Sequence, residues 1–327
     1  MVKKFDVITV GGATEDVTFY TKDGSLVKNP GDILRQELIC FEYGAKINVD
    51  KSFISFGGGA ANAAVCFSKL GFDAACIVAI GHDNIGENIA NNLKKQKIDI
   101  ELIQKVKNQT SGLSFILVSK NNERIIFSNR AANSHLSIKT HDLNKIKNSK
   151  WVYVSSLSGG WKNDIKKIFS VPKINIAWNP GHFQLGDGYK AMGPYLKKVK
   201  VLLLNKDEAL ELVLSNSKYR IKPNKFLNSE LNLLKILKSW GPKTIVITNG
   251  VNGAHAYDGN KVYKQPIYQP KKMIDKTGVG DAFGASFVAG LELFKGNIIK
   301  ALDLGAKNAA MVVSEQGAQN GLLELKK

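Results

Sequence analysis

Short apolar runs alternate with amphipathic stretches along most of this chain. The runs that suit strands are residues 5–10, 74–79, 151–154, 174–177, 201–204 and 244–248. Each run is followed by polar or helical sequence, and residues 59–70 have the pattern of a helix. Strands that alternate with helices favour a parallel sheet covered on both faces, so the pattern predicts an α/β fold.

Two segments break this alternation. Residues 17–56 carry turn residues and aromatics without a clear helix, and residues 99–127 have the pattern of several short strands. We expect them to pair as a small β-sheet lid, formed by segments at about 14–56 and 99–130 that are inserted in the α/β core. Because the chain has neither a tandem repeat nor a low-complexity linker, residues 1–327 are expected to form a single domain.

The last third of the chain, at 281–316, is mostly helical in pattern. Phe283, Phe287 and Leu291 recur at helical spacing, with small residues between them. Such spacing places the three large side chains on one face of a helix. We therefore expect the chain to end in helices that pack closely against the core.

Composition sets the broad class of the protein. A chain of 327 residues with 44% hydrophobic and 23% charged residues can bury a sizeable core, which excludes disordered and fibrous classes. No apolar run approaches the roughly 18 residues of a membrane span, so we expect no membrane partner and a cytoplasmic location. Cys40, Cys66 and Cys76 form no CxxC pair, which predicts buried free thiols rather than a disulfide or zinc site.

The net charge of +18 at first suggests a polyanionic partner such as nucleic acid. However, 42 of the 46 basic residues are lysine. Readers of bases and phosphates depend on the planar fork of arginine, and short lysine runs on helical segments are typical of solvated faces. We therefore expect no nucleic-acid partner.

The most informative segment is DKTGVGDAF at 275–283, a glycine-rich turn that opens a long helix. The first N–H groups of a helix lack internal partners and lie at the positive end of its dipole, and glycines let an anion approach them. Asp281 falls in the first helical turn. Its carboxylate either takes a proton from a substrate beside a bound phosphate or is an ordinary acidic residue at a helix N-terminus, and the residues alone leave both open.

Other phosphate-binding classes fit less well. The chain contains no GxxxxGK[ST] segment, which excludes a Walker-type kinase. Gly11 and Gly12 after the first strand lack the full GxGxxG spacing, which disfavours a Rossmann dehydrogenase.

Together with four further segments, this turn resembles the ribokinase/PfkB family of carbohydrate and nucleoside kinases over nearly the whole chain. The segments, which agree with the family in order and spacing, are GGGAANAAVCFSKLG at 57–71, GHDNIG at 81–86, NKDE at 205–208, TNGVNG at 248–253 and DKTGVGDAF at 275–283. The resemblance implies a ribokinase-like three-layer α/β/α fold, with a mostly parallel central sheet and a small β-sheet lid.

The resemblance also implies a phosphoryl-transfer site. Asp281 would be the general base, and Gly278, Val279 and Gly280 would form an anion hole for the γ-phosphate of ATP. On the nucleotide side, the expected residues are Asn205 and Glu208, acting on Mg²⁺ and phosphates through water, Thr248, Gly250 and Gly253 along the nucleotide, and Asn308 beside the adenine. Asn308 is equally an ordinary polar residue of a helix.

On the acceptor side, the resemblance places Asp16 where family members bind sugar hydroxyls. Gly57, Gly58 and Asn62 would complete this pocket, and Arg130 could reach an anionic or polar substituent of the acceptor. Each residue has a plainer alternative: Asp16 and Asn62 as local caps, the glycines as loop geometry, and Arg130 as a solvent-exposed side chain.

Three departures from the family pattern bear on specificity. Lys276 stands where threonine is common, beside backbone that in many relatives helps to bind potassium, so a monovalent cation at Asp275 and potassium dependence are open. Gly59 and Ala60 replace the Lys-Gly of ribose kinases, which makes ribose a weaker candidate. The lid aromatics, among them Tyr20, suit stacking on a nucleobase or packing within the lid.

We therefore expect an ATP-dependent sugar kinase. The alternatives are a nucleoside kinase of the adenosine, cytidine or inosine type and a non-catalytic relative that binds sugar or nucleotide. A homodimer that forms through the lid is a further expectation, because exposed strand edges favour pairing.

Overall fold

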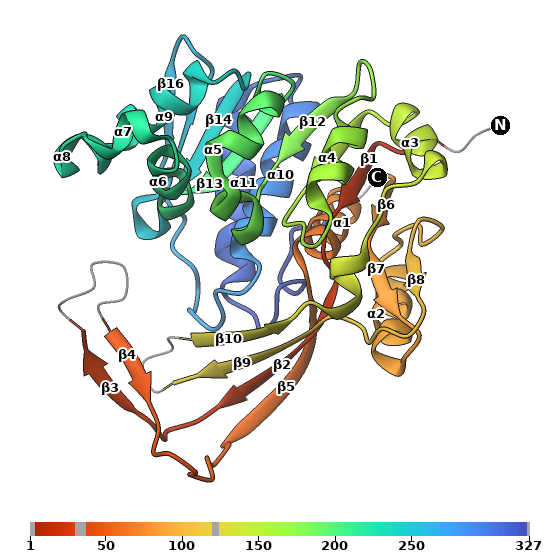
Figure 1. Ribbon diagram of the computed structural model, residues 1–327, viewed down its shortest axis with the longest axis vertical. Coiled ribbons are helices and arrows are strands. Elements are labelled where there is room, and N and C mark those ends of the chain that lie inside the picture. Colours follow the sequence, from red (N-terminus) through yellow and green to blue (C-terminus); the bar gives the residue numbers. More distant parts are fainter. Residues whose placement is uncertain (1–3, 30–36, 120–123, 326–327) are drawn as a thin grey trace.

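The larger part of the protein is a three-layer α/β/α structure built on one eight-stranded sheet (Figure 1). The computed structural model describes residues 4–29, 37–119 and 124–325. In sheet order the strands are β16 (Val262–Gln265), β15 (Ala254–Tyr257), β14 (Thr244–Thr248), β13 (Val201–Asn205), β12 (Asn175–Trp178), β11 (Trp151–Val154), β1 (Val7–Val10) and β6 (Ala74–Ile77). The pairs from β6 to β14 are parallel, and β15 and β16 add an antiparallel edge. The predicted fold class is confirmed.

The central strands are buried on both faces, which explains their continuous apolar runs. Every residue of β1, β6 and β11 is buried. Along β1, alternate side chains enter opposite core clusters: Ile8 and Val10 join one cluster, and Val7 joins the other. A sheet of this kind requires helices on each face, and its parallel strands bring their carboxyl ends to one edge.

Helices cover both faces of the large sheet. One core cluster includes residues of α1 (Gly59–Lys69), α2 (Asn84–Lys95), α10 (Val279–Leu293) and α11 (Ile298–Val312). The other includes residues of α3 (Thr140–Lys147), α4 (Trp161–Ile168), α5 (His182–Leu196), α6 (Lys206–Leu214), α8 (Asn224–Leu227) and α9 (Glu230–Ser239), and α7 (Ser217–Arg220) follows α6. Helices α10 and α11 account for the predicted C-terminal helices.

A second, smaller sheet lies beside this body and is called the lid sheet below (Figure 1). Its order is β10 (Arg124–Asn129), β9 (Leu113–Val118), β2 (Thr14–Tyr20) and β5 (Lys51–Gly57). The hairpin of β3 (Ser25–Lys28) and β4 (Glu37–Cys40) extends from it. Parts of the predicted lid segments, 30–36 and 120–123, lie outside the described residues.

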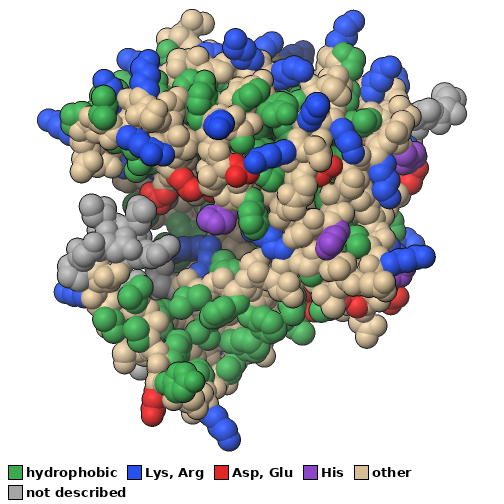
Figure 2. Space-filling model, in the orientation of Figure 1, with side chains coloured by type: hydrophobic (Ala, Val, Ile, Leu, Met, Phe, Trp, Pro, Cys, Tyr) green, Lys and Arg blue, Asp and Glu red, His purple; other side chains and the backbone are tan. Residues whose placement is uncertain are grey.

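The register of the lid sheet separates an inner face from an outer face. Asp16 is paired with Ser114 in the neighbouring strand, and both side chains are buried toward the body. Ile54, Phe115 and Phe127 alternate with them and are 70%, 41% and 58% exposed. Figure 2 shows hydrophobic side chains gathered on the lid and a hollow between the lid and the body. The homodimer through the lid stays a prediction.

Two boundaries differ from the sequence prediction. The run at 74–79 is divided into β6 and β7 (Ala79–Gly81), and β8 (Gln104–Val106) pairs with β7 in a separate two-stranded sheet. Leu102, near the start of the second predicted lid segment, is buried in the core of the body. The start of that segment therefore belongs to the body and not to the lid. Within that segment, the strands of the lid sheet begin only at Leu113.

The cysteine prediction is partly wrong. Cys66 and Cys76 are buried free thiols, and burial raises the pKa of each to about 12. Cys40 is exposed because it ends β4, at the rim of the lid.

The described ranges contain neither a membrane-spanning helix nor a cluster of metal-binding side chains. Among residues 4–29, 37–119 and 124–325, none of the helices is both long and apolar enough to cross a membrane. The same ranges hold no group of three or more His, Cys, Asp or Glu side chains that could bind a metal ion.

Candidate active site

Two adjoining cavities lie where α10 begins. The polar cavity, about 220 Å³, is lined by Arg124, Asn179, Leu203, Leu204, Asn205, Glu208, Thr248, Lys276, Gly278, Gly280, Asp281, Phe283 and Gly284. The apolar cavity has a volume of about 350 Å³ and shares Thr248, Lys276, Gly280 and Phe283 with it. An apolar chamber joined to a polar one suits a ligand with a flat apolar end and a charged end.

The start of α10 supplies free N–H groups to the polar cavity. Gly278 precedes the helix in the left-handed conformation, with φ at 74°. A Cβ there would lie 2.3 Å from the Cβ of Ala318, so only glycine fits. A Cβ on Gly280 would meet nothing within 4 Å, which leaves its backbone open to a ligand. The helix N-terminus therefore has the geometry of an anion site.

Asp281 stands at this N-terminus and is held by a chain of amides. Asn62 Nδ2 donates to Asp281 Oδ2 at 2.8 Å. Gln319 Nε2 donates to Asn62 Oδ1 at 3.1 Å, and Asn92 Nδ2 donates to Gln319 Oε1 at 2.8 Å. Because Gln319 occupies the oxygen of Asn62, the amide nitrogen of Asn62 faces the carboxylate. Burial raises the pKa of Asp281, the hydrogen bond from Asn62 lowers it, and the charge of Asp16 raises it.

Asp16 lies on the inner face of the lid sheet and is only 5% exposed. Thr14 Oγ1 donates to Asp16 Oδ1 at 2.8 Å, while burial raises the pKa of the carboxyl. A Cβ on Gly57 would lie 2.1 Å from Asp16 Oδ2, and a Cβ on Gly58 would lie 2.5 Å from the carbonyl oxygen of Gly12. The two glycines therefore allow the lid carboxylate and the first helix to come together.

Asn205 and Glu208 form a capping box at the start of α6. The backbone N–H of Asn205 donates to Glu208 Oε2, and that of Glu208 donates to Asn205 Oδ1, both at 2.8 Å. Burial raises the pKa of Glu208 from its ordinary value of 4.5 to about 7. Carboxylate and amide oxygens are the ligands that Mg²⁺ prefers, so this wall of the polar cavity fits a magnesium ion that keeps some of its waters.

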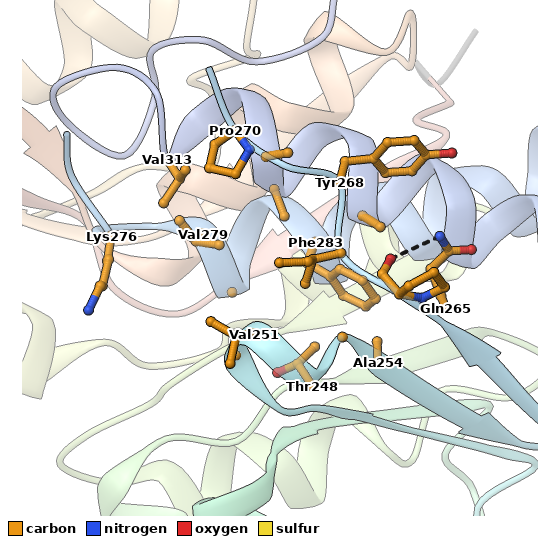
Figure 3. A pocket seen from close by; sticks show the side chains of 18 of the residues that line it. Thr248, Val251, Ala254, Gln265, Tyr268, Pro270, Lys276, Val279, Phe283 and Val313 are labelled. Carbon is orange, nitrogen blue, oxygen red and sulfur yellow. Dashed lines mark hydrogen bonds between the residues drawn. The ribbon is translucent and has the colours of Figure 1, made fainter. Parts of the chain in front are cut away.

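The apolar cavity lies between the loop after β14 and α11. Thr248, Gly250 and Gly253 line it, as do Tyr268 and Phe283. In Figure 3, Thr248, Val251 and Ala254 stand on one side, Tyr268, Pro270 and Val313 stand on the other, and Phe283 lies between them. A flat ring has space between these walls.

Asn308 does not line this cavity, and its place beside the adenine stays a prediction. Its side chain is fully buried between helices, where Nδ2 donates to Ser286 Oγ at 2.7 Å and contacts Cys66 Sγ at 3.3 Å. The backbone N–H of Leu323 donates to Asn308 Oδ1 at 2.8 Å. Helical spacing turns Asn308 toward the core, whereas Ala306, Ala309 and Ala310 face the cavity.

Arg130 is not a solvent-exposed side chain. It follows β10, and its guanidinium lies 5.3 Å from the ring of Phe183, which belongs to the body. Burial lowers its pKa. The residue therefore joins the lid to the body, but it does not line either cavity.

The surroundings of Asp275 do not fit a monovalent cation. Oδ2 accepts from Gln316 Nε2 and from the N–H of Gly317, both at 3.0 Å, and Oδ1 accepts from the N–H of Thr277 at 2.8 Å. Arg124 Nη1 lies 3.6 Å from Oδ1. Protein donors use both oxygens and a guanidinium stands beside them, so a potassium ion there would meet like charge.

Sequence reasoning missed Arg124 and Gln319. Arg124 comes from the lid, whereas Gln319 comes from the segment after α11, and each reaches the site across a large sequence separation. For Arg124, a signal was available: it is one of only four arginines in a lysine-rich chain. For Gln319, no sequence signal was available.

A helix N-terminus that lies open beside a carboxylate is an arrangement that suits a phosphotransferase. The pfkB family carbohydrate kinase model matches residues 31–325, and the chain belongs to this family. It is therefore a phosphotransferase with an alcohol group as acceptor.

Individual relatives agree with this class. A 5-dehydro-2-deoxygluconokinase from Clostridium perfringens is 26% identical over 98% of this chain and 90% of its own length. The nucleoside kinase of Burkholderia thailandensis in complex with inosine has a TM-score of 0.78 at 17% identity, covering 97% of this chain and 94% of that one. Arabidopsis thaliana ribokinase, complexed with ribose and ATP, also has a TM-score of 0.78. Its identity is 18%, and the match covers 98% of this chain and 96% of that one. The two structural likenesses support the fold.

Proposed function

We propose that this enzyme transfers the γ-phosphate of ATP to a hydroxyl of a sugar, with Asp281 as the general base. The observation that carries the proposal is the position of this carboxylate: it lies at the open N-terminus of α10, within the polar cavity, and is oriented by Asn62. A base beside an anion site is the arrangement that phosphoryl transfer to an alcohol requires.

In the proposed step, the Asp281 carboxylate takes the proton of the acceptor hydroxyl as its oxygen attacks the γ-phosphorus. A new P–O bond forms, and the bond from the γ-phosphorus to the bridging oxygen of ADP breaks. The products are a phosphate ester, ADP and one proton, which Asp281 releases. Because burial raises its pKa, Asp281 is a stronger base than a solvent-exposed aspartate.

The N–H groups at Gly278, Val279 and Gly280 stabilise the charge on the transferred group, because preorganised donors act where negative charge develops. Magnesium would be held by Glu208 and Asn205 through water and would neutralise phosphate charge. The nucleotide base lies in the apolar cavity, along Thr248, Gly250 and Gly253.

The acceptor lies against Asp16, Gly57, Gly58 and Asn62. A sugar fits this polar surface better than a nucleoside, because two lid aromatics are used elsewhere. Phe19 stacks on Phe115 on the outer face, with ring centroids 6.1 Å apart. The hydroxyl of Tyr20 donates to Gln316 Oε1 at 2.7 Å. In this proposal, the Arg130 guanidinium, which stacks near Phe183, would contact an anionic substituent of the acceptor.

The test is a panel of acceptors, with turnover of each measured as the release of ADP. Ribose, fructose, 2-keto-3-deoxygluconate and 5-dehydro-2-deoxygluconate represent the sugars, and adenosine, cytidine and inosine represent the nucleosides. We expect turnover with a sugar. Turnover with nucleosides alone would overturn the proposed acceptor class.

The base is tested with Asp281→Asn, which we expect to lower kcat by about 10²- to 10⁴-fold, as loss of a positioned base does. Asp187→Asn is the matched control. Asp187 forms a surface ion pair with Lys162, and the amide keeps an oxygen for Trp161. If Asp281→Asn turns over as fast as Asp187→Asn, another group accepts the proton.

A further inference from the structure

A carboxylate outside both cavities lies behind the loop that forms one wall of the apolar cavity. Thr248, Gly250 and Gly253 of this loop line the cavity, and Ala254 continues the wall into β15. Glu230 begins α9, which packs against β14 and β15. Helix α9 joins one core cluster, whereas α10 and α11 join the cluster on the other face of the sheet. The carboxylate therefore approaches the loop from the side opposite the cavity.

Glu230 uses its two oxygens on two different partners. Asn249 Nδ2 donates to Oε1, and His255 Nδ1 contacts Oε2. The side chains of Glu230 and His255 are only 17% and 18% exposed. The N-terminus of α9 favours a negative charge at Glu230, because the helix dipole is positive there. These two contacts, called the Glu230 link below, tie α9 to the loop and to β15 at once.

The alternation of side chains along β15 explains how the Glu230 link affects the cavity without entering it. Ala254 lines the cavity, and the next residue, His255, contacts Glu230 on the side of α9. Successive residues of a strand point to opposite faces of the sheet. A shift of His255 would therefore move the cavity wall at Ala254 with it.

Asn249 connects the Glu230 link to the whole loop. It directly follows Thr248, its backbone N–H donates to the carbonyl oxygen of Gly253 at 2.8 Å, and its own carbonyl oxygen accepts from the N–H of Asn252 at 2.9 Å. Val251, at the tip of the loop, is 75% exposed, so the tip gains little from packing. The position of this loop thus depends on Asn249, which the carboxylate holds.

We propose that Glu230 is a positioning residue for the nucleotide, which acts through Asn249 and His255 to set the position of the loop and the width of the apolar cavity. The proposal rests on the proposed function, because it assumes that the base of the nucleotide lies in this cavity. A loop that is already ordered spares the ligand the entropic cost of ordering it, which raises affinity. The phosphate groups, which lie at the N-terminus of α10, do not depend on this loop.

The experiment measures binding by calorimetry in Glu230→Ala, Asn249→Ala and wild type. We expect the Kd for ADP to rise about tenfold in each variant, near the lower end for loss of a hydrogen bond to a charged group. Inorganic tripolyphosphate with magnesium occupies only the polar cavity, so its Kd should stay unchanged. In turnover, the KM for ATP should rise while kcat and the KM for the acceptor stay the same.

Three further variants sharpen the comparison. The double variant of Glu230→Ala and Asn249→Ala should bind ADP no more weakly than either single variant, because both act through one contact. Glu230→Gln keeps an acceptor oxygen for Asn249, so its Kd should fall between those of wild type and Glu230→Ala. Glu87→Ala is the matched control: it removes an exposed acidic residue from the first turn of α2, outside both cavities, and should bind ADP as wild type does.

A purely structural role for Glu230 predicts a lower Tm with ADP affinity unchanged, and this result would overturn the proposal. Additive losses in the double variant, or equal losses for ADP and tripolyphosphate, would also overturn it. Asn249→Ala, in a loop, keeps the test available should Glu230→Ala fold poorly.

The two proposals fail separately. Calorimetry with ADP needs no acceptor, so if wild type phosphorylates no sugar, the proposed acceptor is wrong while Glu230 is still tested. If wild type phosphorylates a sugar and the variants bind ADP as it does, the role of Glu230 alone is wrong. Failure of wild type to bind ADP would overturn both.

Discussion

The capping box of α6 holds a carboxyl that the fold would be more stable without. Glu208 is half-buried and lines the same cavity as Asp281, and desolvation raises its pKa from 4.5 to about 7. Glu208→Gln removes the charge but keeps the shape, and the amide oxygen can still accept from the N–H of Asn205. The substitution therefore isolates the free energy of placing a negative charge in this wall of the polar cavity.

The magnitude follows from proton linkage. The folded state binds the Glu208 proton more tightly than the unfolded state, so stability is lost as the pH rises from about 4.5 to about 7 and is constant above that range. One pKa unit corresponds to about 1.36 kcal/mol, which makes the loss about 3 kcal/mol. For 327 residues, with an unfolding entropy of about 2.1 cal/mol/K per residue, this corresponds to about 5 °C in Tm.

The assay is thermal unfolding followed by circular dichroism at pH 4.5 and pH 8, without nucleotide or magnesium. We expect Glu208→Gln to melt about 5 °C above wild type at pH 8 and close to it at pH 4.5. Glu211→Gln, on the exposed side of the same helix, is the matched control and should change Tm little at either pH. A gain that is equal at both pH values, or equal in the two variants, would refute the linkage argument.

Two further predictions concern the acceptor and the base. Gly57→Ala places a Cβ 2.1 Å from Asp16 Oδ2, which disturbs the proposed acceptor pocket. We expect steady-state kinetics to give a KM for the acceptor that is about tenfold higher, with the KM for ATP little changed. A raised KM for ATP alone would contradict this placement of the acceptor. Asn62→Ala removes the hydrogen bond that lowers the pKa of Asp281. The acid limb of the plot of kcat/KM against pH should therefore move to higher pH. An acid limb that does not move would mean that Asp281 is not the group that titrates.

The sequence could predict those parts of the site that are local in the chain. Gly278 and Asp281 occur in one short segment whose helix start is visible from its glycines, and Asn205 with Glu208 has the spacing of a capping box. The large sheet was predictable for the same reason, because strands buried on both faces are continuous apolar runs. The burial of Asn308 could not be predicted, because the side of a helix that packs against the core depends on tertiary contacts, which a lone asparagine in a helix does not reveal.

The lid contacts show what local sequence cannot supply. Arg124 and Arg130 flank the same strand, yet one reaches the loop at 275–277 and the other reaches Phe183. What each arginine contacts depends on the angle between the two sheets, and no spacing within β10 encodes that angle. The overall charge of +18 is equally uninformative, because it is mostly lysine spread over the surface seen in Figure 2. The scarcity of arginine is more informative for Arg124, because its guanidinium fork reaches two atoms of the loop at 275–277 at once.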